Sequence, residues 1–334
     1  MKTTGTTRRG FMLSGAAAAL ASAVVAQTQA SASGIPTRPL GRTGVRVSLL
    51  GLGGAHVGRV QPEAEAVRMI HAAIDQGITF MDNAWEYNKG RSEEVMGKAF
   101  LAPSYRDKAF LMTKVCSREA KGITEQLEES LRRLNTDRID LIQFHECNYH
   151  NDPDWLVERG ALKALLDARQ QGKVRFIGFT GHKSPAIHNR MLALGVKWDA
   201  CQMPNNVMDA GFLSFRHETM PVCLEKNIGI IGMKGCCGDG KLIAAGLATV
   251  EECYRYCLSQ PVSTQVVGLT SMEMLETALR IGRSFEPLTQ EEHQGLITRL
   301  REPRGDGRYE LFKTSKQYDS AYHRTQHGFN VQGT

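Results

Sequence analysis

The sequence lacks a strong net charge. Its 334 residues carry +6 at neutral pH. Three of the cations, Lys2, Arg8 and Arg9, lie in an N-terminal segment that we expect to be removed, and 6 − 3 leaves +3. The remaining basic residues alternate with acids along helical stretches such as Glu125–Arg133, which is typical of solvated faces. This balance argues against a nucleic-acid-binding surface, so no nucleic-acid partner is predicted.

The cysteine spacing of a metal or iron-sulfur protein is also missing. Cys236 and Cys237 are adjacent, and Cys253 and Cys257 are one helical turn apart, but neither pair belongs to a Cys-x-x-Cys repeat. Most of the eight cysteines lie in apolar strand or helix runs, so we expect buried free thiols and no metal.

An apolar run long enough to span a membrane is absent as well. The run Ala16–Ala26 is short, and it follows Thr7–Leu13, which contains the Arg8-Arg9 pair. Small residues ending at Ala30 or Ala32 would suit a signal peptidase. Residues 1–32 therefore resemble a twin-arginine export signal, which predicts a partner in that export machinery and a periplasmic or other extracytoplasmic location. Because this pathway moves folded proteins, the signal also hints at a bound cofactor.

What the sequence does contain is ordinary globular composition, with 42% apolar residues, and a regular alternation of short apolar runs with helical patterns from Val47 onward. Such alternation is typical of repeated βα units. Eight strands are predicted: 47–52, 78–81, 109–113, 139–144, 174–179, 200–203, 228–233 and 264–268. Eight consecutive units close most naturally as a (β/α)8 TIM barrel, here over residues 36–286.

A doubly wound sheet is the competing α/β architecture. It needs a glycine-rich phosphate loop after its first strand, and Leu50–Ala55 is rich in glycine. That segment lacks the full glycine spacing, and no acidic residue follows a second strand in the expected role. The barrel is therefore favoured.

The two ends of the barrel region carry additions. Arg38–Val47 is predicted to form a hairpin with a glycine turn that plugs the bottom of the barrel. After the last unit, residues 287–334 are predicted to add an amphipathic helix at Leu288–Arg301 and a polar tail from Tyr309 to Thr334.

Three successive predicted strands finish in ionisable residues, namely Asp82, Lys114 and His145, and Tyr87 follows in the loop after the second strand. In a barrel the carboxyl ends of the strands gather around one centre, so these side chains should meet. Carbonyl reduction needs a proton donor, and a tyrosine beside an ammonium has its pKa moved down from about 10 toward the working pH. We predict Tyr87 as the acid, Lys114 as the ammonium, Asp82 as its carboxylate partner and His145 as a hydrogen-bonding group for the substrate oxygen.

A metal-dependent barrel hydrolase is an alternative from a different enzyme class. It would use His145, His150 and His182 as ligands. It would also need a carboxylate from another strand, and it leaves Lys114 without a role.

The motifs around these residues resemble those of the aldo-keto reductase family, from residue 36 to about 285. The resemblance rests on the segment from Asp82 to Tyr87 with the following Ser92-Glu93, on Thr113–Val115, on Phe144-His145 and on the entry Pro39–Gly44. It implies a (β/α)8 barrel, a nicotinamide cofactor extended across the strand ends, and Tyr87 as general acid.

The same resemblance implies a set of cofactor-binding positions. Gln202 would hold the nicotinamide amide, Thr180 and Gly181 replace a commoner Ser-Asn pair beside His182, and Met233 replaces an aromatic under the ring. The remaining implied positions are Lys234, Gly240 in a loop over the pyrophosphate, and Gly268, Thr270, Ser271 and Met274 at the adenosine end.

The arginine that usually grips a 2′-phosphate in this family is missing, and Ser271 stands about where it would be. NADP(H) is preferred by the resemblance, with NAD(H) as the alternative. The predicted function is a carbonyl reductase or alcohol dehydrogenase that acts on a small-molecule carbonyl or alcohol. A non-catalytic nicotinamide-sensing barrel is the alternative function.

Overall fold

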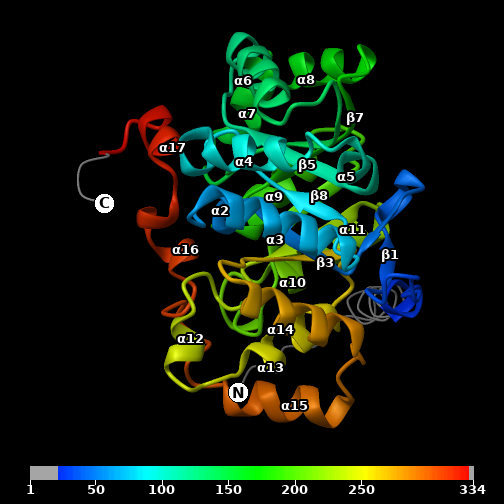
Figure 1. The fold of residues 1–334 in the computed structure, drawn as a ribbon. Helices are drawn as coiled ribbons and strands as arrows, with labels where there is room; N and C mark the ends of the chain where they lie inside the picture. Colours follow the sequence, from blue (N-terminus) through cyan, green and yellow to red (C-terminus); the bar gives the residue numbers. More distant parts are fainter. Residues whose placement is uncertain (1–21, 331–334) are drawn as a thin grey trace, which may run out of the picture.

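The structure, a computed structural model, describes residues 22–330 and contains a closed barrel of eight parallel strands. Each strand pairs with its neighbours in the chain, and the last pairs with the first (Figure 1). The strands are β3 (Leu50–Gly53), β4 (Phe80–Asp82), β5 (Phe110–Val115), β6 (Ile139–Phe144), β7 (Val174–Thr180), β8 (Ala200–Pro204), β9 (Gly229–Met233) and β10 (Thr264–Val267). The predicted (β/α)8 barrel is confirmed, and the doubly wound sheet is excluded.

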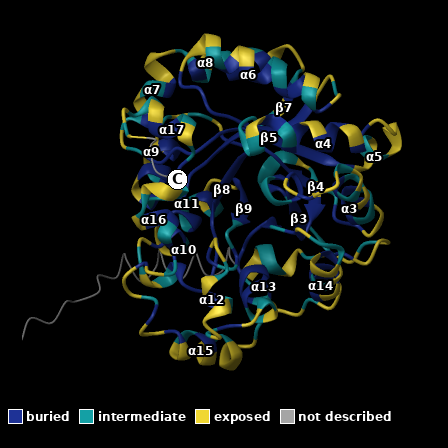
Figure 2. Ribbon diagram, turned by 60° about the vertical axis from the view of Figure 1, so that its left-hand side comes forward, coloured by how far each residue is buried: buried dark blue, intermediate teal, exposed yellow. Residues whose placement is uncertain are grey.

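Helices follow the strands and form the outer layer of the molecule (Figure 2). Their bounds are α2 (Gly54–Val57), α3 (Glu63–Asp75), α4 (Arg91–Ala99), α5 (Pro103–Lys108), α6 (Ala120–Arg133), α7 (Asp152–Glu158), α8 (Ala161–Gln170), α9 (Pro185–Leu192), α10 (Phe215–Glu218), α11 (Met220–Glu225), α12 (Lys241–Ala244), α13 (Val250–Leu258), α14 (Met272–Arg283), α15 (Gln290–Arg299), α16 (Leu311–Thr314) and α17 (Ala321–Gln326). Short 3-10 turns are η1 (Gly41–Thr43), η2 (Tyr87–Gly90), η3 (Asp209–Gly211) and η4 (Lys316–Tyr318).

Amphipathic spacing explains how the helices cover the barrel. In α6, Ile123, Leu127 and Leu131 are buried against the strands, whereas Glu125 and Arg132 face solvent. Apolar residues three or four positions apart lie on one face of a helix, and burying that face supplies most of its stability. Nearly all strand residues are buried, with Arg175 in β7 as the one exposed exception among the barrel strands described, so the strands appear dark in the centre of Figure 2.

The predicted hairpin is present as β1 (Thr37–Pro39) and β2 (Arg46–Ser48), with Gly44 at φ 76° in its turn. Leu40 and Val47 pack with inward-facing strand residues such as Phe80, so the hairpin closes one end of the barrel. The prediction that the first barrel strand begins at Val47 was wrong. Ser48 ends the hairpin, because its hydroxyl donates to the Leu50 carbonyl and accepts from two backbone amides of the next unit.

The chain after the barrel folds back over the other end. The helix predicted at 288–301 is α15, which begins at a capping box formed by Thr289 and Glu292. Beyond it, α16, η4 and α17 lie on the side of the barrel away from the hairpin, as the red and blue segments of Figure 1 show.

The predicted export motif, Thr7–Leu13, lies outside the described residues and stays a prediction. Within residues 22–330, no helix combines the length and the apolar character needed to cross a bilayer. The cysteine prediction is confirmed: all eight are free thiols, and all but the half-buried Cys236 are buried.

Candidate active site

A cavity of about 1360 Å³ opens at the carboxyl ends of the barrel strands. The strand ends supply its floor with Asp82, Lys114 and Gln202, and the C-terminal tail supplies part of its wall with Tyr318 and Tyr322. Ligand cavities of drug size occupy about 300–1,000 Å³, so this one has room for a larger, extended molecule.

The structure brings the four predicted catalytic side chains together on this floor. Asp82 is the last residue of β4, Lys114 lies near the end of β5, His145 directly follows β6, and Tyr87 opens η2. The Lys114 ammonium donates to the Asp82 carboxylate, to the Asn83 carbonyl at 2.7 Å and to the Tyr87 hydroxyl at 3.2 Å. The rings of Tyr87 and His145 meet edge to face with centroids 5.3 Å apart.

The electrostatic environment of Tyr87 differs from the sequence expectation. Burial raises the pKa of Tyr87 well above 10, and the carboxylates of Asp82 and Glu86 add to this effect. Lys114 was expected to lower that pKa, but its charge is balanced at once by Asp82, so burial prevails. The phenol therefore stays protonated at neutral pH, which is the form that a proton donor needs.

His145 is oriented by an acid that sequence reasoning missed. Its Nδ1 lies 2.8 Å from Oε1 of Glu86, and Nε2 has no hydrogen-bond partner among the described residues. Burial lowers the pKa of His145, and Glu86 only partly opposes this effect, so the imidazole is neutral. Burial alone would raise the pKa of Glu86, but its interaction with His145, which includes the hydrogen bond from Nδ1, lowers that pKa to about 2, so the carboxylate is the charged member of the pair. The position of Glu86 directly before Tyr87 was the available signal.

Most of the positions implied for a cofactor line the cavity. They are Thr180, Gly181, His182, Gln202, Met233, Lys234, Gly240, Gly268, Thr270 and Met274. Ser271 is the exception, since it is not a lining residue. Its hydroxyl caps α14 by accepting from the Met274 amide at 3.2 Å.

One feature of this lining fits a dinucleotide. The side-chain oxygen of Gln202 is buried and has no hydrogen-bond partner among the described residues, which leaves an acceptor for a carboxamide group. Gly268 has a packing role instead, because a Cβ there would lie 2.5 Å from the ring of His56.

His182 also contacts the C-terminal tail. Its Nε2 lies 3.0 Å from the carboxylate of Asp319 in the tail, and Lys183 lies 3.0 Å from the same carboxylate. Tyr149 donates to the other oxygen of Asp319. Three groups around the barrel mouth thus hold the tail over the cavity. Sequence reasoning left the tail as a polar segment of uncertain order.

The histidines of the hydrolase alternative do not converge. His150 is exposed on the surface, while His182 is buried and paired with Asp319. Of these three histidines only His145 belongs to the catalytic tetrad, so this alternative finds no support in the described part of the chain.

The buried His188, which contacts the backbone of Gln202, should make the stability of the protein depend on pH. His188 Nε2 contacts the Gln202 carbonyl at 3.2 Å, and burial lowers the pKa of His188 to about 4. Between pH 6.5 and 4 the unfolded chain binds a proton that the folded chain does not bind, so stability falls as pH falls. Between pH 7 and pH 4.5, we expect the unfolding free energy of wild type to fall by about 2–3 kcal/mol more than that of His188→Gln. Each pH unit between the two pKa values of His188 contributes about 1.4 kcal/mol to this difference.

Urea unfolding at the two pH values measures this difference. The exposed His150 provides the control, because His150→Gln should lose as much stability as wild type. Equal losses in His188→Gln and wild type would show that His188 is protonated in the folded protein.

The comparisons with known proteins agree with this geometry. The sequence profile described as the aldo/keto reductase family matches residues 49–242. The chain is 40% identical over 152 residues to "Aldo-keto reductase YhdN" of Bacillus subtilis (strain 168), covering 41% of this chain and 44% of that protein. It is 32% identical over 157 residues to "L-galactose dehydrogenase" of Arabidopsis thaliana, covering 44% and 49%. The chain thus spans about half the length of the curated relatives it matches.

Solved structures share the fold. Aldo-keto reductase AKR11C1 from Bacillus halodurans superposes in its apo form with a TM-score of 0.62 at 26% identity, covering 79% of this chain and 96% of that one. Its holo form gives a TM-score of 0.67 at 24% identity over 79% and 96%.

Proposed function

Because the chain belongs to the aldo/keto reductase family, which matches more than half of it at residues 49–242, we propose that it is an NAD(P)H-dependent oxidoreductase that reduces an aldehyde or a ketone. The observation that carries this proposal is the position of Lys114, which joins Asp82 to Tyr87 on the floor of the cavity. A purely structural role would not require an ammonium, a carboxylate and a phenol to be buried together.

A bound nicotinamide supplies the hydride that such a reduction needs. Tyr87 donates its proton to the carbonyl oxygen, and the phenol is protonated at neutral pH because burial raises its pKa. Lys114, 3.2 Å from the hydroxyl, stabilises the phenolate that remains, and Asp82 holds Lys114 in place. Because His145 Nδ1 donates to Glu86, Nε2 is a hydrogen-bond acceptor, so it can orient the hydroxyl group of the alcohol product.

The residues that would hold the cofactor run along the cavity. Gln202 offers its unpaired oxygen to the nicotinamide amide, and the left-handed turn at Gly240, with φ 74°, exposes backbone at the pyrophosphate. The start of α14 would receive the adenosine end. Among the lining residues of 268–277, Glu273 is the only charged one.

Because of Glu273 we expect NAD(H) as the cofactor, although the sequence resemblance alone prefers NADP(H). A carboxylate accepts hydrogen bonds from a ribose 2′-hydroxyl but repels a 2′-phosphate. We therefore expect NADH to bind at least about tenfold more tightly than NADPH, which corresponds to about 1.4 kcal/mol. Removing the carboxylate in Glu273→Gln should narrow this gap.

Fluorescence titration of the purified protein with each nucleotide measures both affinities, and nucleotide oxidation in the presence of a panel of aldehydes measures turnover. Glu276→Gln is the matched control, because Glu276 is an acid of the same helix that does not line the cavity. Tighter binding of NADPH would contradict the assignment of Glu273. Binding of neither nucleotide would contradict the oxidoreductase proposal itself.

A further inference from the structure

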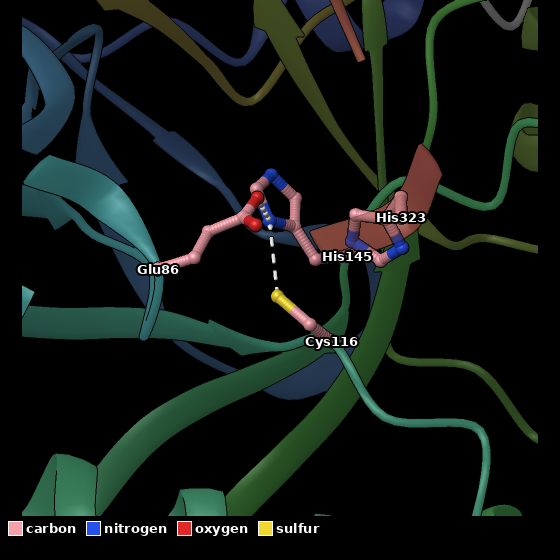
Figure 3. A group of neighbouring side chains, drawn as sticks. All are labelled: Glu86, Cys116, His145 and His323. Atoms are coloured by element: carbon pink, nitrogen blue, oxygen red, sulfur yellow. Dashed lines mark hydrogen bonds and ion pairs between the residues drawn. The ribbon is translucent and has the colours of Figure 1, made fainter. Parts of the chain in front are cut away.

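Beside the catalytic tetrad, four side chains of metal-binding type converge from distant parts of the chain. They are Glu86 after β4, Cys116 after β5, His145 after β6 and His323 in α17. One donor atom from each lies within 4.8 Å of the other three (Figure 3). Carboxylate, thiolate and imidazole are the ligands that proteins use for zinc.

The spacing of these donor atoms is close to that of an assembled site. His145 Nδ1 lies 2.8 Å from Oε1 of Glu86 and 3.7 Å from Sγ of Cys116. In tetrahedral zinc sites, with bonds of about 2.0 Å to nitrogen and about 2.3 Å to sulfur, donor atoms lie about 3.3–3.8 Å apart. Adjustments of about 1 Å or less would bring the four groups to this geometry.

The unpartnered ring of His323 is a second, independent observation that points to a ligand. Its side chain is completely buried, and neither ring nitrogen has a hydrogen-bond partner among the described residues. Its ring meets that of His145 edge to face, with centroids 5.7 Å apart. A buried imidazole without a partner is unfavourable, and a coordinated cation would give one of its nitrogens a partner.

Charge balance also favours a divalent cation here. A glutamate carboxylate, a cysteine thiolate and two neutral imidazoles carry a total charge of −2, which one Zn²⁺ ion neutralises. Neutrality matters in this place because Cys116 and His323 are fully buried, and an uncompensated charge in such surroundings is costly.

The backbone behind two of the ligands is held in place. Arg118 is fully buried and donates to the carbonyl oxygens of Cys116 and His145, both at 2.9 Å. Groups that fix the ligands of a metal in this way contribute strongly to its affinity.

We propose that Glu86, Cys116, His145 and His323 bind one Zn²⁺ ion, which fastens α17 to the barrel next to the tetrad. On binding, the thiol of Cys116 releases its proton to solvent, and the proton of His145 Nδ1 moves to Nε2. Nε2 then becomes a fixed hydrogen-bond donor on the cavity side of the ring. No oxidation or reduction takes place at the metal.

The test is metal binding to the full chain in the absence of nucleotide and substrate, so it is independent of the proposed reductase activity. After treatment with EDTA and dialysis, the protein is titrated with ZnCl₂ against a chromophoric chelator. Wild type is expected to bind one equivalent. Cys116→Ser and His323→Gln should each weaken binding at least about 100-fold, because losing a group that only orients a ligand already costs about 10–100-fold.

CoCl₂ provides a second measurement, since a thiolate bound to Co²⁺ gives a charge-transfer absorption band that Cys116→Ser should lack. Cys147→Ser and His150→Gln, which change the same residue types outside the cluster, should bind Zn²⁺ within about threefold of wild type. Thermal melting in EDTA shows whether each variant is folded.

Hydrogen exchange of residues 321–326 should slow when Zn²⁺ is added to wild type but not to folded His323→Gln. Absence of one tight equivalent in wild type, or equal affinity in the wild type and both ligand variants, would overturn the proposal.

Discussion

Tyr87→Phe is expected to lower kcat for aldehyde reduction by about 10²–10⁴-fold and to leave nucleotide affinity unchanged. The substitution removes the hydroxyl that lies 3.2 Å from the Lys114 ammonium. It keeps the ring, which packs against His145 and lies 4.7 Å from the same ammonium. The loss should therefore fall on proton donation. Steady-state kinetics, together with nucleotide titration of the same preparations, measures both quantities.

Tyr105 provides a matched control, because its hydroxyl bonds Asp75 on the surface, away from the cavity. Tyr105→Phe should keep both kcat and nucleotide affinity. If Tyr87→Phe retained wild-type turnover, another group would have to donate the proton. If wild type bound nucleotide but reduced no aldehyde, the nicotinamide-sensing alternative would be favoured.

Arg118→Met is expected to lower the free energy of unfolding by about 3–5 kcal/mol, the largest stability effect that we predict. The guanidinium is fully buried, pairs with Asp152 at 2.8 Å and donates to three backbone carbonyls around Cys116, His145 and Glu146. Methionine fills a similar volume but leaves a buried carboxylate and these carbonyls without their partner. Urea denaturation at neutral pH measures the change.

Two further variants separate the causes. Lys121 is exposed and pairs with Glu125 on the surface of α6, so Lys121→Met should change stability by less than about 1 kcal/mol. Adding Asp152→Asn to Arg118→Met should recover part of the loss, because it removes the buried carboxylate charge that Arg118 no longer balances. An effect of Arg118→Met no larger than that of Lys121→Met would refute the role assigned to the buried pair.

The sequence predicted the barrel and the tetrad because both depend on local patterns. Alternating βα runs predict parallel strands, and strand ends predict that Asp82, Lys114 and His145 meet. The contacts of the tail have no such pattern. Asp319 meets His182 across 137 positions of the chain, and neither residue lies in a periodic segment. The capping role of Ser271 was missed for a different reason. The family resemblance assigned this position to the cofactor, whereas in the structure its hydroxyl accepts from a backbone amide at the start of α14.

The segment after the barrel also determines when the cavity becomes enclosed during synthesis. The last barrel strand ends at Val267, whereas Tyr318 and Tyr322, which form part of the cavity wall, are synthesised later. Among the residues that the structure describes, no strand pair of the barrel involves this segment. A nascent chain can therefore complete its eight strands while the cavity mouth is still open, and the mouth is covered when Asp319 reaches His182.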